Sequence, residues 1–291
     1  MSSLKEVRTR ITSVNSTQQI TSAMKMVAAS KLRRAQMAIV NMRPYAKKLN
    51  EILQNVTASL DDSEENVYGD IRAVNRGLIV CITSNRGLCG AFNANVIKKS
   101  RALLENEFAN TPVDIITIGK KASDFFSKDE YNHIGSYDDF FTKLSFEQVS
   151  PLASELLQKF ADKEYDKIYV VYNQFKNAAT QLTTAEQLLP VVAPEKAEDA
   201  PKTNSNYLFD PSQEAIVNSL LPSILKTQFY KALLDSFASE HGARMTAMQQ
   251  ATDNAQEMLR DLKLTYNKAR QASITGEILE IVGGAEALKN A

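Results

Sequence analysis

The chain is poor in histidine, the residue on which many catalytic and metal sites depend. Its 291 residues include only His133 and His241, and neither lies in a His/Glu cluster at metal-ligand spacing. No serine combines with a histidine and an aspartate in a pattern that suggests a triad. We therefore expect no catalytic site, no metal and no cofactor in this chain.

Cysteine and long apolar runs are also scarce. Cys81 and Cys89 are the only cysteines, and no histidine accompanies them at zinc spacing, which favours a reduced cytosolic compartment. No stretch approaches the roughly 18–20 apolar residues of a membrane helix. The first five residues lack the apolar stretch of a signal peptide. The hydrophobic fraction, 44%, is that of a globular protein.

Both ends of the chain carry a strong helical pattern. Near the N-terminus an apolar or small residue recurs every three or four positions: Leu32, Ala35, Ile39, Met42, Ala46, Leu49, Leu53, Val56 and Leu60. A similar series occupies the other end: Leu234, Ala238, Met245, Met248, Ala255, Leu259, Leu262, Tyr266 and Ala269. Such seams predict two helices packed lengthwise. At ~1.5 Å per residue, roughly 60 helical residues reach about 90 Å, so we expect a projecting shaft.

The middle of the chain alternates between strand and helix patterns. We expect strands at 77–83, 113–118, 167–172 and 180–190, the last at an edge, and helices at 91–108, 120–127 and 146–161. This order predicts a Rossmann-like α/β domain with a mostly parallel sheet. The predicted divisions are 1–60 for the first shaft helix, 61–209 for the central domain and 210–291 for the last helix, with Asp210 and Pro211 at its start. Pro44 and Pro222 should bend the terminal helices.

Charge is unevenly distributed although the formal net charge is zero. The first 50 residues carry ten Lys or Arg against one acid, Glu6. A basic helix in a neutral protein indicates an anionic partner. On charge alone, nucleic acid, a membrane surface, an acidic protein loop and a solvated face without a partner all stay open.

One loop lies where α/β proteins bind phosphate. Residues 84–93 (Ser-Asn-Arg-Gly-Leu-Cys-Gly-Ala-Phe-Asn) follow a predicted strand and open a helix. They match neither the three-glycine dinucleotide pattern nor the phosphate loop that ends in Gly-Lys-Ser/Thr. A tight strand-to-helix turn that needs small residues is therefore favoured over a nucleotide site.

Four segments together resemble the γ subunits of F-type ATP synthases, and the resemblance spans essentially the whole chain. They are residues 17–31 (from Thr17-Gln18-Gln19-Ile20), Arg86–Gly90, Ala243–Ala255 and Lys268–Gly284. The resemblance implies an antiparallel coiled coil of the terminal helices beside the Rossmann-like domain. It also implies a non-catalytic central-stalk rotor, which turns with the membrane c-ring inside a hexamer of α and β subunits and so couples proton flow to ATP synthesis or hydrolysis.

The resemblance also carries residue roles. Met24, with Lys25 beside it, is similar to the position that faces an acidic lever loop of a β subunit. Arg244, Gln271, Thr275 and Glu277 are similar to contact and coupling positions toward the β subunits, with Arg244 able to grip a carboxylate in bidentate fashion. Tyr207 is similar to the foot that meets the c-ring, and the ε subunit is expected nearby.

The expected location follows from the same resemblance. Without a presequence, a bacterial chain on the cytoplasmic face of the plasma membrane is expected, reached only through the complex; a processed mitochondrial chain is the alternative. Two rival functions stay open: a nucleotide-dependent α/β enzyme dimerised by its terminal helices, and a basic coiled coil that binds nucleic acid. The favoured reading includes no nucleic-acid partner.

Overall fold

The structure is a computed structural model that describes residues 4–57, 67–109, 111–128, 130–142, 144–191 and 213–289. Its contacts divide the chain into two compact units. Residues 29–244 form one unit, called here the α/β unit, and residues 1–28 with 245–291 form the other, called the helical unit. The helices α1 (Leu4–Thr57) and α5 (Gln213–Lys289) each contribute to both.

The α/β unit is built on a five-stranded sheet in the order β3-β2-β1-β4-β5. Its strands are β1 (Gly77–Ile82), β2 (Val113–Ile118), β3 (Asn132–Ser136), β4 (Lys167–Phe175) and β5 (Gln181–Leu189). The first four are parallel, and β5 is antiparallel to β4 at the edge. Between β1 and β4 the strand order reverses, which is the position where open α/β sheets bind ligands.

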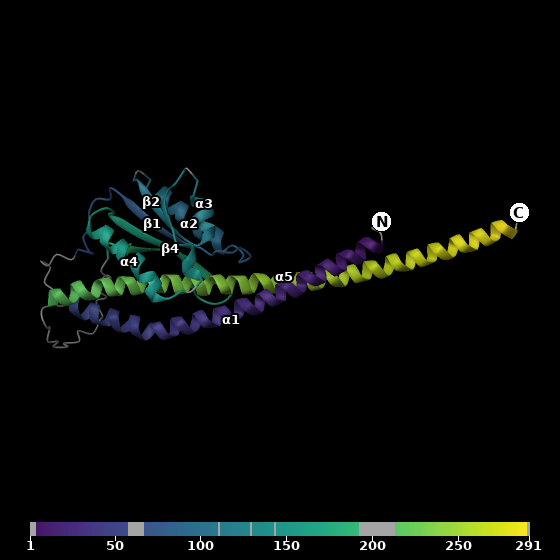
Figure 1. Cartoon of the computed structure of the whole chain (residues 1–291), viewed down its shortest axis with the longest axis horizontal. Coiled ribbons are helices and arrows are strands. Elements are labelled where there is room, and N and C mark those ends of the chain that lie inside the picture. Colours follow the sequence, from purple (N-terminus) through teal and green to yellow (C-terminus); the bar gives the residue numbers. More distant parts are fainter. Residues whose placement is uncertain are drawn as a thin grey trace. The chain divides into compact units, whose positions relative to one another are not determined.

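Helices cover both faces of this sheet (Figure 1). They are α2 (Phe92–Asn106), α3 (Lys120–Phe126) and α4 (Phe146–Ala161), together with a short 3-10 turn, η1 (Asp138–Phe141). One buried cluster joins the sheet to α4 and to Phe229 and Leu233 of α5, and the other joins it to α2 and α3. Because both faces are covered, the central strand is apolar throughout rather than alternating.

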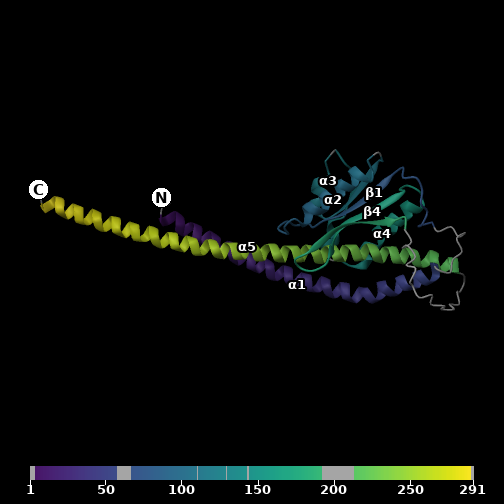
Figure 2. The same ribbon diagram turned by 180° about the vertical axis from the view of Figure 1, so that it is seen from behind.

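The helical unit is a pair of antiparallel segments. Figure 2 shows the start of α1 beside α5 and running in the opposite direction, as Figure 1 does. The Thr21 and Thr252 hydroxyls share a hydrogen bond of 2.8 Å across the pair. Val7 and Leu259 are buried in the seam. With residue 21 opposite 252, α1 reaches only to about residue 269 of α5, so the rest of α5 extends beyond its partner.

These observations confirm the predicted fold class, a mostly parallel sheet with two long terminal helices. One detail differs from expectation. The short strand β3 was not predicted. As expected, both terminal helices continue past their prolines, Pro44 and Pro222. Leu221 and Leu225 on either side of Pro222 are buried, so tertiary packing offsets the lost backbone donor. The predicted cap at Asp210 and Pro211 lies outside the described residues.

Candidate functional site

The residues that the sequence singled out fall into separate groups. Met24 and Lys25 lie half-buried on α1, level with the Thr252 region of α5. Gln271 and Thr275 are exposed and lie nineteen or more residues further along α5, which is about 28 Å or more of helix. The helical unit therefore does not bring them into one site. Tyr207 lies outside the described residues.

Glu277 faces away from the other two polar positions of this end of α5. Gln271 and Thr275 are four residues apart and share a face of the helix. Glu277 follows Thr275 by two residues, about 200° around the helix, so it points to the opposite side; all three are exposed. A single partner that touches all three must surround α5.

The end of α5 also exposes many apolar side chains, which the sequence reading missed. They are Leu264, Ile274, Ile278, Leu279, Ile281 and Val282, and Ile281 is 70% exposed. The signal was available, because these side chains recur at helical spacing past the point where α1 can cover them. Polar residues such as Gln271 are interspersed among these side chains and make the apolar pattern less evident.

Arg244 lies in the α/β unit and is only 9% exposed. Its Nη1 donates to Glu240 Oε1 at 2.5 Å, one helical turn earlier on α5. Its Nη2 donates to the carbonyl oxygens of Arg86 (2.8 Å) and Gly87 (3.2 Å), which belong to the loop after β1. The structure thus places this predicted contact residue in a buried cluster within its own chain.

Electrostatics in this cluster follow from burial. Burial raises the pKa of Glu240, and the positive charge of Arg244 opposes that effect. Burial, together with the nearby cations Arg244 and Lys31, lowers the pKa of His241 to about 3. The imidazole is therefore neutral at physiological pH, so the cluster contains one carboxylate–guanidinium pair beside a neutral ring.

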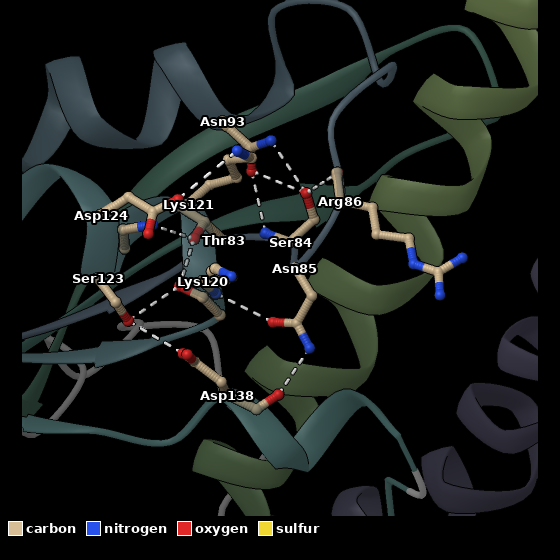
Figure 3. Close-up of polar contacts among 12 residues, drawn as sticks. Thr83, Ser84, Asn85, Arg86, Asn93, Lys120, Lys121, Ser123, Asp124 and Asp138 are labelled. Carbon is tan, nitrogen blue, oxygen red and sulfur yellow. Dashed lines mark hydrogen bonds and ion pairs between the residues drawn. The ribbon is translucent and has the colours of Figure 1, made fainter.

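The loop after β1, residues 83–91, lies at the place where this kind of sheet binds ligands, and side-chain oxygens occupy two backbone N–H groups there (Figure 3). Ser84 N–H donates to Asn93 Oδ1 at 2.9 Å, and Lys120 N–H, at the start of α3, donates to Asn85 Oδ1 at 3.0 Å. Asn173 of β4 donates to the Phe92 carbonyl at 3.0 Å. The Ser84 and Lys120 N–H groups are therefore not free for a phosphate, and the Asn173 bond occupies a carbonyl oxygen.

Close packing is found at the neighbouring turn, between β2 and α3. Gly119 has φ of 101°, and a Cβ built there would meet the Thr83 carbonyl oxygen at 2.1 Å. Only glycine fits at this approach. Within the predicted turn itself, Gly90 has φ of 60°, but a Cβ at Gly87 or Gly90 would meet nothing within 4 Å, so close packing does not require small residues there. Figure 3 shows the Arg86 side chain extending away from the network.

Comparison with known proteins gives a consistent result over the whole chain. The family model described as ATP synthase matches residues 3–288. The ATP synthase gamma chain of Flavobacterium johnsoniae is 58% identical over 288 residues, which cover 99% of each chain. That of Cytophaga hutchinsonii is 54% identical over 297 residues and covers 100% of both.

Solved structures agree with the sequence relatives. A chain in the Euglena gracilis mitochondrial ATP synthase, described as OSCP/F1/c-ring in rotational state 3, has a TM-score of 0.69 and 25% identity, covering 98% of this chain and 94% of that one. A chain of the Tetrahymena thermophila mitochondrial ATP synthase, described as central stalk/c-ring, has a TM-score of 0.57 and 27% identity, covering 80% and 99%. The chain belongs to the ATP synthase gamma chain family.

Proposed function

We propose that this chain is the central-stalk rotor of an F-type ATP synthase. It turns inside a hexamer of α and β subunits and couples proton flow through the membrane c-ring to ATP synthesis or hydrolysis at the β subunits. The ε subunit binds beside it. The observation that carries the proposal is the exposed apolar end of α5.

That end carries apolar side chains on more than one side. Ile274, Ile278 and Ile281 share one face at i, i+4 and i+7, whereas Leu279 and Val282 extend the apolar surface around the helix. A helix that is apolar on several sides is normally enclosed by other protein. A socket formed by surrounding subunits would enclose it, as the rotor function requires.

The polar contact residues are proposed on the same basis. Gln271, Thr275 and Glu277 point to different sides of α5 and would meet different subunits of the hexamer. Met24 and Lys25 would face an acidic loop of a β subunit, in preference to nucleic acid. Exposed ion pairs contribute roughly 0–1 kcal/mol each, so coupling is spread over many contacts. Tyr207 is proposed to meet the c-ring.

We propose that the chain is not itself catalytic and binds no cofactor. Two hydrogen bonds at the loop after β1 support this, because a phosphate could reach the N–H groups of Ser84 and Lys120 only by displacing Asn93 and Asn85 from them. Equilibrium dialysis of the purified chain with ATP tests the rival enzyme function. Saturable binding at micromolar ATP would favour a nucleotide-dependent enzyme.

Among the described residues no helix is both long and apolar enough to cross a membrane. We propose that the chain reaches the membrane only through the c-ring, on the cytoplasmic face of a bacterial plasma membrane. The bacterial sources of the two gamma-chain relatives support this placement.

The decisive experiment is rotation in a reconstituted complex. The chain is expressed with α and β subunits, the complex is immobilised through the β subunits, and a bead is attached to Lys98→Cys on the exposed face of α2. We expect one copy of the chain per hexamer and unidirectional rotation driven by ATP. A hexamer that hydrolyses ATP at full rate while the bead stays still would overturn the rotor function.

A further inference from the structure

The guanidinium of Arg244 makes its hydrogen bonds to groups of its own chain. A guanidinium has five N–H donors in a planar fork. In addition to the bonds from Nη1 and Nη2, Nε of Arg244 lies 3.4 Å from the Gly87 carbonyl oxygen. The fork therefore joins Glu240 on α5 to two carbonyls of the loop after β1. A fork used in this way is not free to take a partner's carboxylate in bidentate fashion.

His241, which follows Glu240 on α5, also contacts the guanidinium of Arg244. The ring is 4% exposed, and its Nδ1 lies 3.4 Å from Arg244 Nη1. Since arginine only donates, Nδ1 accepts this bond in the tautomer that carries the ring proton on Nε2, and the buried Nε2 then has no hydrogen-bond partner among the described residues. The ring also meets Phe237 edge-on at 4.5 Å, which fixes its orientation. His241 thus contacts Nη1, the guanidinium nitrogen that also binds Glu240, and not the nitrogens that bind the loop.

The loop that Arg244 holds has a conformation that needs support. Leu88 has φ of 62° and is 63% exposed, although bulky non-glycine residues rarely occupy the left-handed region. Such a conformation persists only where its surroundings determine it. On one side the loop is fixed by the bond between Ser84 and Asn93, and on the other by Arg244. Cys89 is buried between them.

We infer that Arg244 acts as an internal lock between α5 and the loop after β1, with Glu240 and His241 as the residues that position its guanidinium. The lock fastens α5 to the carboxyl edge of the sheet. When α5 turns about its own axis, the loop therefore moves with it. This role goes beyond the rotor function and differs from direct contact with another subunit.

The test uses Cys89 as a reporter in the full-length chain without other subunits. In Arg244→Lys the charge is kept but the fork is lost, so the loop opens more often and we expect N-ethylmaleimide to alkylate Cys89 about tenfold faster. Arg244→Ala should act in the same direction. Its lost charge would raise the pKa of the Cys89 thiol and slow alkylation, so acceleration reports exposure rather than reactivity.

The His241 pair tests the positioning role. Replacing His241 with leucine removes the acceptor, and we expect about threefold faster alkylation of Cys89. With His241→Gln, a side-chain oxygen can again accept from Arg244, and the rate should return close to that of the unchanged chain. A purely space-filling role for His241 would give the opposite ranking, because leucine is the more apolar replacement.

Two controls separate the lock from other causes. Cys81 is fully buried and its pKa is raised to about 12 by burial, so it should stay unmodified unless the chain unfolds. Arg86→Ala removes an exposed guanidinium but keeps the carbonyl that Arg244 binds, so Cys89 should react at the unchanged rate.

If Cys89 reacts at the unchanged rate in both Arg244 variants, the lock is overturned; a slower ATP turnover in the assembled complex would then assign Arg244 to direct subunit contact. This outcome leaves the rotor function standing, because the alkylation assay involves no other subunit. If Cys81 also reacts in an Arg244 variant, that variant has unfolded. The comparison of His241→Leu with His241→Gln then decides whether Arg244 acts as a lock.

Discussion

The two halves of α5 share one continuous helix but have different surroundings. From residue 220 to Arg244, most positions are buried, and Leu225, Phe229 and Leu233 belong to the core of the α/β unit or lie against it. From residue 270 to 286, nearly every position is exposed, including Ile281. The first half therefore belongs to the fold, and the second has a surface that a different protein must complete.

The effect of a mutation in α5 therefore depends on which half of the helix carries it. In the buried half, a substitution changes the free energy of unfolding of the chain itself. In the exposed half, changing a side chain has little effect on the stability of the isolated chain and acts mainly on its function in the complex, while a change of backbone propensity, as at a glycine, can still alter helix stability. The helical pattern is similar in both halves, so the pattern alone does not assign a residue to folding or to function.

The largest expected effect lies in the buried half. Phe229 is fully buried between α5 and the sheet, and Phe229→Ala should lower the free energy of unfolding by about 3–5 kcal/mol through lost transfer energy and a residual cavity. Urea denaturation followed by circular dichroism measures this. The matched substitution Ile281→Ala should change the value by less than about 0.5 kcal/mol. Equal losses at the two positions would remove the distinction between the halves.

The buried half of α5 should also make the stability of the chain depend on pH. The pKa of His241 is lowered to about 3 in the folded chain, through burial and the facing cations Arg244 and Lys31, with Glu240 as the nearby acid. Between that value and the ordinary 6.5, the unfolded chain binds a proton that the folded chain does not. Stability should therefore fall as pH decreases in this window, by up to about 1.4 kcal/mol per pH unit.

His241→Gln removes this contribution. Urea midpoints of the two chains, measured from neutral pH down to about pH 4, should diverge, with the unchanged chain losing more stability at the acidic end. Parallel profiles would mean that His241 is accessible to protons in the folded state, which would contradict its burial against Arg244.

Much of this fold was predictable because its strongest signals are local. The strand β1 is a continuous apolar run, and β2 and β4 are mainly apolar, as expected for central strands covered on both faces. The strand β3, Asn-His-Ile-Gly-Ser, was missed because it pairs on one side only and carries a single large apolar residue, Ile134. Edge strands give weak patterns for this reason.

The Arg244 cluster was not predictable in the same way. Arg244 lies 157 positions from Gly87, and its partners there are backbone carbonyls, which leave no trace in a residue pattern. The resemblance suggested a contact with a β subunit, and the geometry adds a partner inside the chain. The apolar end of α5, in contrast, could have been found by comparing the lengths of the two helices.

A charge in the exposed half should impair function without unfolding. Ile278→Asp should change the free energy of unfolding by less than about 0.5 kcal/mol, because the side chain is half exposed in the isolated chain. In the assembled complex we expect ATP turnover to fall roughly tenfold, since a carboxylate in an apolar socket is costly.

The control for this substitution lies in the other unit. Ile71 is 77% exposed in the α/β unit, and Ile71→Asp introduces the same charge in the same chemical change. We expect turnover at the unchanged rate. If both variants lose activity equally, the loss reflects the added charge rather than the position, and the proposed socket around α5 is wrong.

The smallest effect compares two glycines of α5. A Cβ at Gly242 would lie 3.2 Å from the carbonyl oxygen and 3.3 Å from the Cα of Ala178, in the turn between β4 and β5, whereas a Cβ at Gly276 meets nothing within 4 Å. Alanine is favoured over glycine inside a helix by about 0.5–1 kcal/mol. Gly276→Ala should therefore stabilise α5, seen as helical circular dichroism retained to higher temperature.

At Gly242 the same gain meets backbone that cannot easily move. Overpacking typically costs about 1–3 kcal/mol, so Gly242→Ala should lower the free energy of unfolding by about 1 kcal/mol once the helix gain is included. Opposite signs for one chemical change on one helix would place the boundary between its two environments between these residues. Stabilisation by both substitutions would mean that the turn at Ala178 yields, and that α5 is less tightly held by the sheet at this point than its contacts indicate.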